Sequence, residues 1–86
     1  MKTFKDLIFN PHTIADNSSH AVCEFENGYG VSVISGPRFY TDTNHPYELA
    51  ILYKGAISYN TGITDDVIGH LTSKQVTYYM KKVQAL

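Results

Sequence analysis

The sequence has little cysteine, no long apolar run and no excess of charge of either sign. Its single cysteine, Cys23, excludes an internal disulfide framework and a zinc site built from several cysteines. No stretch approaches the roughly 20 apolar residues that cross a membrane. The apolar part of residues 1–9 is also too short and too interrupted for the core of a signal peptide. We therefore expect no membrane partner, and we expect the chain to stay in a reducing cytoplasm, which suits a free thiol.

The few charged residues are scattered along the chain. Seven Lys and Arg against eight Asp and Glu give a net charge of −1. Proteins that bind nucleic acid concentrate positive charge on one face, because neutralising phosphates supplies most of their affinity. Nucleic acid is therefore not the expected partner. In that alternative, Lys74, Lys81 and Lys82 would form the patch, and binding would weaken steeply with salt.

The length and composition predict one folded domain over residues 1–86. Hydrophobic residues make up 43% of the 86 residues and charged residues 17%, which excludes a disordered acidic tail and a coiled coil. A core of this size is small, so we expect marginal stability.

The strongest local signal is a β-hairpin around Asn27-Gly28. A two-residue loop would place valine and glutamate side chains together on one face. A three-residue loop, with Gly28 left-handed in a bulge, instead pairs Cys23 with Val31 and gathers apolar side chains on one face. Because the register follows the face that can be buried, we predict the three-residue loop.

Two more apolar segments complete the predicted sheet. Residues 4–9 form a short strand that ends at the turn signal Asn10-Pro11. Residues 47–53 lack alternation, which is typical of a central strand covered on both faces. Lys54-Gly55 then turns the chain into residues 56–59 and makes a second hairpin.

Two helices are predicted after the sheet. Thr64 precedes two aspartates, a pattern typical of the first turn of a short helix that continues to Leu71. Thr72-Ser73-Lys74-Gln75 is a capping box that begins a longer helix. The apolar stripe of that helix is Val76, Tyr79, Met80, Val83 and Leu86. The predicted fold is α+β: an antiparallel sheet of four to five strands, including two hairpins, with one short and one longer C-terminal helix packed on one face.

Three stretches carry a resemblance that spans most of the chain. FENGYGVSVI (25–34), YELAIL (47–52) and ITDDVIGHLT (63–72) resemble a family of small, uncharacterised proteins of tailed bacteriophages and prophages. The match is weakest over residues 14–20 and 38–45, and Lys54-Gly55 replaces a longer stretch that the family usually has. The resemblance implies an accessory phage protein made in the bacterial cytoplasm, without a catalytic motif or cofactor. Such proteins often bind and inhibit host factors, including restriction and CRISPR machinery.

Two groups of residues could carry chemistry, and each has a structural interpretation. Asp66 and His70 would share a helix face and, with Asp65 and His45, could serve a small metal-dependent enzyme. Two ligands without a third favour a capped helix start instead. Cys23 points into the core in the predicted register, so its thiol is expected to be inert. We predict no catalytic residue, no metal and no cofactor.

A segment held between two prolines is the main candidate for binding. Tyrosine and arginine are the side chains that most often anchor interfaces, and proline reduces the entropy that a loop loses on binding. The candidate residues of this segment are Arg38, Phe39, Tyr40, His45 and Tyr47. Tyr78 lies off the helix stripe and is a further candidate, against a partner or a second copy of the chain. We expect a non-enzymatic protein that binds a bacterial host protein and inhibits a defence factor of the CRISPR or restriction type.

Overall fold

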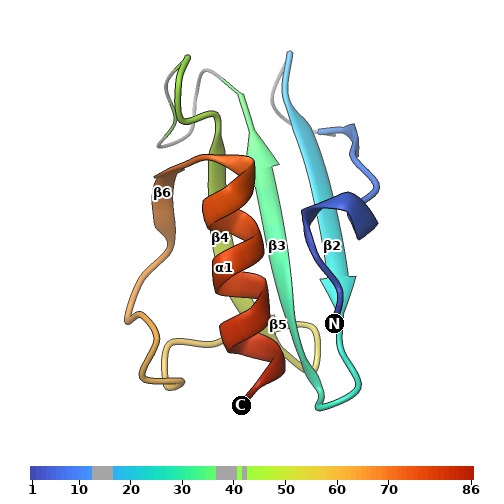
Figure 1. Cartoon of the computed structure of the whole chain (residues 1–86), viewed down its shortest axis with the longest axis vertical. Helices are drawn as coiled ribbons and strands as arrows, with labels where there is room; N and C mark the ends of the chain where they lie inside the picture. The colour runs from blue at the N-terminus through green and yellow to red at the C-terminus, as the bar shows by residue number, and fades with distance from the viewer. Residues whose placement is uncertain (13–16, 37–40, 42) are drawn as a thin grey trace.

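The apolar segments of the chain form an antiparallel sheet, and an amphipathic helix covers one side of it (Figure 1). The computed structural model describes residues 1–12, 17–36, 41 and 43–86. In chain order the elements are the 3₁₀ turn η1 (Phe4–Asp6), the strands β1 (Asn10–Pro11), β2 (Ser19–Glu24), β3 (Tyr29–Ser35), β4 (Tyr47–Tyr53), β5 (Ala56–Ile57) and β6 (Ile68–Leu71), and the helix α1 (Ser73–Gln84). The fold is α+β.

Five strands pair in chain order, and β4 also pairs with the sixth, β6. The order is β1-β2-β3-β4-β5, and every pair is antiparallel. β5 pairs with the end of β4 at Leu52 and Tyr53, whereas β6 pairs near its beginning at Tyr47 and Leu49. The described residues thus make a six-stranded sheet, where four to five strands were expected.

The first hairpin has the predicted register. Cys23 pairs with Val31, and the Phe25 N–H donates to the Tyr29 carbonyl oxygen at 2.7 Å. Gly28 closes the three-residue loop with φ +85°, a left-handed conformation that favours glycine. The apolar residues of both strands therefore face the same side of the sheet, as the register argument required.

The second hairpin is also confirmed, although its last strand is short. Lys54 and Gly55 both have positive φ, 50° and 85°, which is the geometry of a two-residue type I′ turn. The Lys54 N–H donates to the Gly28 carbonyl oxygen at 2.9 Å and so ties the turns of the two hairpins together. Side chains on both faces of β4 are buried, as expected for a central strand: Leu49 and Ile51 on one face, Glu48 and Leu52 on the other.

α1 packs its predicted apolar stripe against the sheet, except for Leu86, which lies beyond the end of the helix and is 43% exposed. Thr72 begins the helix with a capping box: its hydroxyl accepts the Gln75 N–H at 3.2 Å, and Gln75 Oε1 accepts the Thr72 N–H at 2.9 Å. Val76, Met80 and Val83 are fully buried because their spacing of three to four residues puts them on one face. They form the core with sheet residues that include Val31, Val33, Leu49 and Ile51.

The prediction of a short helix after Thr64 is wrong, and a single α-helix occurs in the described residues. Asp66 Oδ1 accepts the N–H of the next residue, Val67, at 2.7 Å, and the Thr64 hydroxyl bonds the backbone of Asp66. These side chains stabilise turns rather than cap a helix. Residues 68–71 instead form β6, because the edge of β4 offers backbone partners that an isolated two-turn helix lacks.

The prediction of a strand over residues 4–9 is also wrong. Phe4–Asp6 is a 3₁₀ turn, in which the Thr3 N–H donates to Asp6 Oδ2 at 2.8 Å. The Phe4 N–H donates to the Thr77 hydroxyl of α1 at 3.0 Å. This segment therefore lies beside the helix and adds to its layer instead of to the sheet.

The two ends of the chain lie at the same end of the molecule (Figure 1). The side-chain amide of Gln84 accepts the Lys2 N–H at 2.8 Å and donates to the Lys2 carbonyl oxygen at 2.7 Å. Within the described part of the chain, no helix has the length and apolar character that crossing a membrane requires.

Candidate functional site

Only part of the segment between β3 and β4 belongs to the described residues. Arg38, Phe39 and Tyr40 lie outside the described residues. Of the rest of that segment, His45 is exposed, and the Thr41 hydroxyl donates to the Gly36 carbonyl oxygen at 2.7 Å. β3 ends and β4 begins at the end of the sheet opposite the chain termini (Figure 1). A binding role for Arg38, Phe39, Tyr40 and His45 stays a prediction.

Tyr47 belongs to an aromatic cluster between the sheet and the N-terminal segment. Its ring centroid lies 5.0 Å from that of Phe4 and 5.8 Å from that of Phe9, and Phe4 and Phe9 are 5.8 Å apart. Ring pairs at these separations stabilise beyond the area that they bury. The half-buried Tyr47 ring thus holds η1 on the sheet, so any contact with a partner would use its remaining exposed edge.

Tyr78 is exposed, as its position off the helix stripe predicts. Its side chain is 53% exposed, and its ring meets that of Tyr79 edge-on at 5.1 Å. The Lys82 ammonium lies 5.2 Å from the Tyr78 ring centroid, a cation–π distance. A cationic group and an aromatic face are therefore presented together on the outer side of α1.

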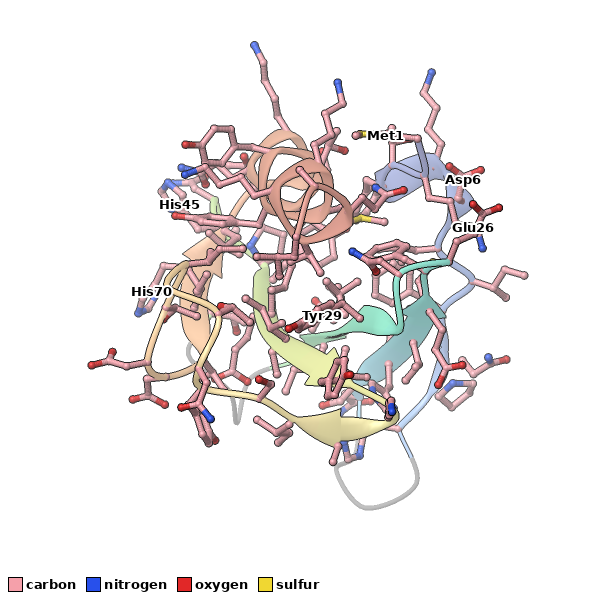
Figure 2. The ribbon with its side chains drawn as sticks, turned by 90° about the horizontal axis from the view of Figure 1, so that it is seen from below. Met1, Asp6, Glu26, Tyr29, His45 and His70 are labelled. Atoms are coloured by element: carbon pink, nitrogen blue, oxygen red, sulfur yellow. The ribbon has the colours of Figure 1, made fainter. Side chains whose placement is uncertain are left out.

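The predicted pairing of Asp66 with His70 rests on a helix that the described residues do not form. His70 is exposed in β6, and Asp65 and Asp66 lie in the preceding turn, so the helix face on which they were expected to meet does not form. Figure 2 shows His45 and His70 on one flank of the molecule and Asp6 and Glu26 on the other. Among the described residues, no three His, Cys, Asp or Glu side chains are grouped so that they could hold a metal ion.

Cys23 is buried in the core, as its register predicts, with 8% of its surface exposed. Burial raises the pKa of the Cys23 thiol, because the thiolate is poorly solvated there. The reactive form is therefore disfavoured, and a structural role suits this residue.

A pair of histidines joins β1 to β2. The rings of His12 and His20 have centroids 5.6 Å apart, and His20 Nε2 lies 2.7 Å from the Ser32 hydroxyl. Burial lowers the pKa of His20, and the neighbouring His12 lowers it further. The folded chain therefore binds a proton at His20 less tightly than the unfolded chain does.

A groove of about 590 Å³ lies between the N-terminal residues, the β2–β3 turn and the end of α1. Asn27 and Gln84 line it, and both are engaged in the fold. Asn27 Nδ2 donates to the carbonyl oxygens of Val83 at 3.0 Å, Leu86 at 3.3 Å and Gln84 at 3.4 Å. Since these amides form hydrogen bonds within the chain, the groove marks the place where three segments are held together. The sequence pattern identified Asn27 only as a turn residue.

The side of the sheet opposite α1 carries exposed apolar side chains that our sequence analysis missed. Val22 alternates with the buried Ala21 and Cys23, so it points away from the core, and 53% of it is exposed. Ile57 pairs with Leu52 on that same side and is 54% exposed. An apolar residue at the polar position of an alternating strand was the available signal.

No protein-family model, curated protein or solved structure matches this chain.

Proposed function

We propose that this chain is a non-enzymatic protein that works by binding a protein partner on the sheet face opposite α1. The observation that carries the proposal is the exposure of Val22 and Ile57, each more than half accessible, on that face. Large apolar side chains that stay accessible beside a small core are typical of a surface that becomes buried in a complex.

The sheet register places mostly small residues between these two side chains. Val22 is opposite Ser32, which pairs with Ala50, and in the next row Gly30 pairs with Leu52. Gly30 and Ala50 carry little or no side chain, and Leu52 beside them is buried. A partner side chain that packed between Val22 and Ile57 would be shielded from water, which is the setting in which interface anchors contribute most.

The setting of this activity comes from the resemblance to small phage proteins. It favours a bacterial host protein as the partner, within the bacterial cytoplasm, and a defence factor of the restriction or CRISPR type as the inhibited target. Arg38, Phe39 and Tyr40 would add guanidinium and aromatic contacts to the partner.

The test begins with capture of host proteins and continues with the purified captured protein. The variant Val22→Ser/Ile57→Ser removes two exposed apolar side chains, each worth about 1 kcal/mol when buried, so the dissociation constant should rise about 30-fold. Ile8→Ser is the matched control, because Ile8 is 77% exposed but lies between η1 and β1. The control should bind normally, and all variants should unfold at the wild-type temperature.

Two results would contradict the proposal. The first is equal binding by the control and the double variant. The second is a dimer in light scattering that the double variant converts to monomer, since a second copy would then cover this face. A separate triple variant, Arg38→Ala/Phe39→Ala/Tyr40→Ala, tests the loop: binding should be lost while the fold persists, and unchanged capture would remove the loop from the interface.

A further inference from the structure

The outer side of α1 carries charge of one sign. The helix contains Lys74, Lys81 and Lys82, all exposed, and no Asp or Glu. Its residues at spacings of three and four bring Tyr78 onto the same stripe, directly opposite the buried stripe of Val76, Met80 and Val83. Lys74 and Lys82 are eight residues apart, which spans about 12 Å along the axis.

The N-terminal segment extends this charged stripe sideways. The hydrogen bond from the Phe4 N–H to the Thr77 hydroxyl holds η1 beside α1, and Lys5 of η1 is exposed. Figure 2 shows η1 and α1 together on the same side of the sheet. Four of the six lysines of the chain thus belong to one layer: Lys5, Lys74, Lys81 and Lys82. The acidic side chain of that layer is Asp6, whose carboxylate accepts the Thr3 N–H.

The residue types of this basic face fit phosphate better than protein. Lysine is depleted where proteins contact one another, whereas lysine ammonium groups supply phosphate contacts throughout nucleic-acid recognition. The Tyr78 ring, half exposed and flanked by Lys74 and Lys82 one turn away on either side, provides an aromatic surface between cations. Cations interleaved with an exposed ring are the arrangement that binds single strands, because an unpaired base can stack while phosphates meet the lysines.

We propose that the basic face formed by α1 and η1 binds single-stranded nucleic acid. Tyr78 stacks on a base, and Lys5, Lys74, Lys81 and Lys82 contact the adjoining phosphates. This face lies on the opposite side of the sheet from Val22 and Ile57, so it is independent of the protein-binding surface proposed above.

Fluorescence anisotropy with a labelled oligothymidylate of about 12 nucleotides tests the proposal. Neutralising about four phosphates of a single strand gives a slope near −3 in log affinity against log salt, so affinity should fall about 50-fold between 50 and 200 mM salt. Lys74→Gln/Lys81→Gln/Lys82→Gln should remove most of that slope and lower the affinity by a similar factor at the lower salt. Tyr78→Ala should weaken binding about tenfold and leave the slope unchanged.

Lys54→Asn is the matched control. It removes one positive charge, where the triple variant removes three, and takes it from the β4–β5 turn, where φ of 50° suits asparagine. It should bind as the wild type does. All the substituted side chains are exposed, so circular dichroism should show an intact fold for each variant.

Four results would overturn the proposal: no binding at the lower salt, an equal loss with Lys54→Asn, tighter binding of a duplex that ignores Tyr78→Ala, or equal affinity for a polyglutamate peptide. The last result would assign the face to acidic proteins. Val22→Ser/Ile57→Ser should bind the oligonucleotide normally, which keeps failure of this proposal distinct from failure of the protein-binding proposal.

Discussion

Asn27 should contribute more to stability than a turn residue normally does, because one side chain joins the first hairpin to the end of the helix. Its Nδ2 donates to the Val83 carbonyl oxygen at 3.0 Å, and its Oδ1 accepts the Tyr29 N–H at 3.1 Å. The Val83 carbonyl oxygen also accepts the Leu86 N–H at 3.2 Å, so the Asn27 amide gives the end of the helix a further donor, from another segment. Asn27→Ala removes both interactions without straining the backbone.

The expected loss follows from these two shorter bonds. Each hydrogen bond contributes about 1 kcal/mol net, so Asn27→Ala should lower the free energy of unfolding by about 2 kcal/mol. For a domain of this size that corresponds to a fall in Tm of about 8 to 16 °C. Urea denaturation followed by circular dichroism measures the free energy, and a thermal scan measures the Tm.

Two further variants separate the hydrogen bonds of Asn27. Asn27→Asp keeps the acceptor for Tyr29 but loses the donor and places a negative charge at the negative end of the α1 dipole, so it should be at least as unstable as Asn27→Ala. Asn60→Ala changes an exposed asparagine between β5 and β6 and should have little effect. Wild-type stability of Asn27→Asp would refute the capping role, and a loss below about 0.5 kcal/mol in Asn27→Ala would refute both interactions.

Three other substitutions test separate parts of the fold. Gly30→Ala should destabilise by about 2 kcal/mol in urea denaturation, because the new Cβ would lie 2.6 Å from the Cys23 carbonyl oxygen; a neutral effect would show that the strands separate easily. The lowered pKa of His20 means that the unfolded chain binds its proton more tightly, so wild-type stability should be complete above pH 6.5 and fall as the pH drops from there toward the lower folded value. His20→Gln should flatten the dependence of stability on pH in that range. An unchanged slope would mean that another group binds the proton. Gln84→Ala should cost about 1 to 2 kcal/mol and speed hydrogen exchange at the Lys2 amide, and unchanged exchange there would contradict the amide pairing.

Local patterns predicted the elements whose own residues decide the outcome. The register of the first hairpin followed from Gly28 and from the requirement that Cys23 and Val31 share a buried face. The capping box and stripe of α1 likewise followed from Thr72 and from the spacing of Val76 and Met80. In these elements the local preference and the tertiary packing agree.

The errors fall where a distant partner decides the conformation. Thr64 and the two aspartates after it have the composition of a helix start, but the segment that follows pairs with the beginning of β4, more than 15 residues earlier in the chain. Residues 4–9 have an apolar pattern that suits a strand, but Phe4 bonds and packs beside α1. Contacts of this kind carry no signal in the neighbouring sequence.

The candidate surfaces show the same division. Tyr78 could be placed on the outside of the helix from spacing alone, and its exposure is confirmed. The gathering of Lys5 with the lysines of α1 could not be inferred, because it depends on where η1 docks. A binding role for Arg38, Phe39 and Tyr40 stays a prediction.

The amide pairing of Gln84 with Lys2 has a practical consequence for reshaping the chain. Since Lys2 and Gln84 are already neighbours, a few glycines and serines would join the two ends into a circle at small entropic cost. New ends could then be cut in the exposed stretch around Asn60. Such a permuted molecule would carry its tags beside β5 and leave the contact between Lys2 and Gln84 free of them.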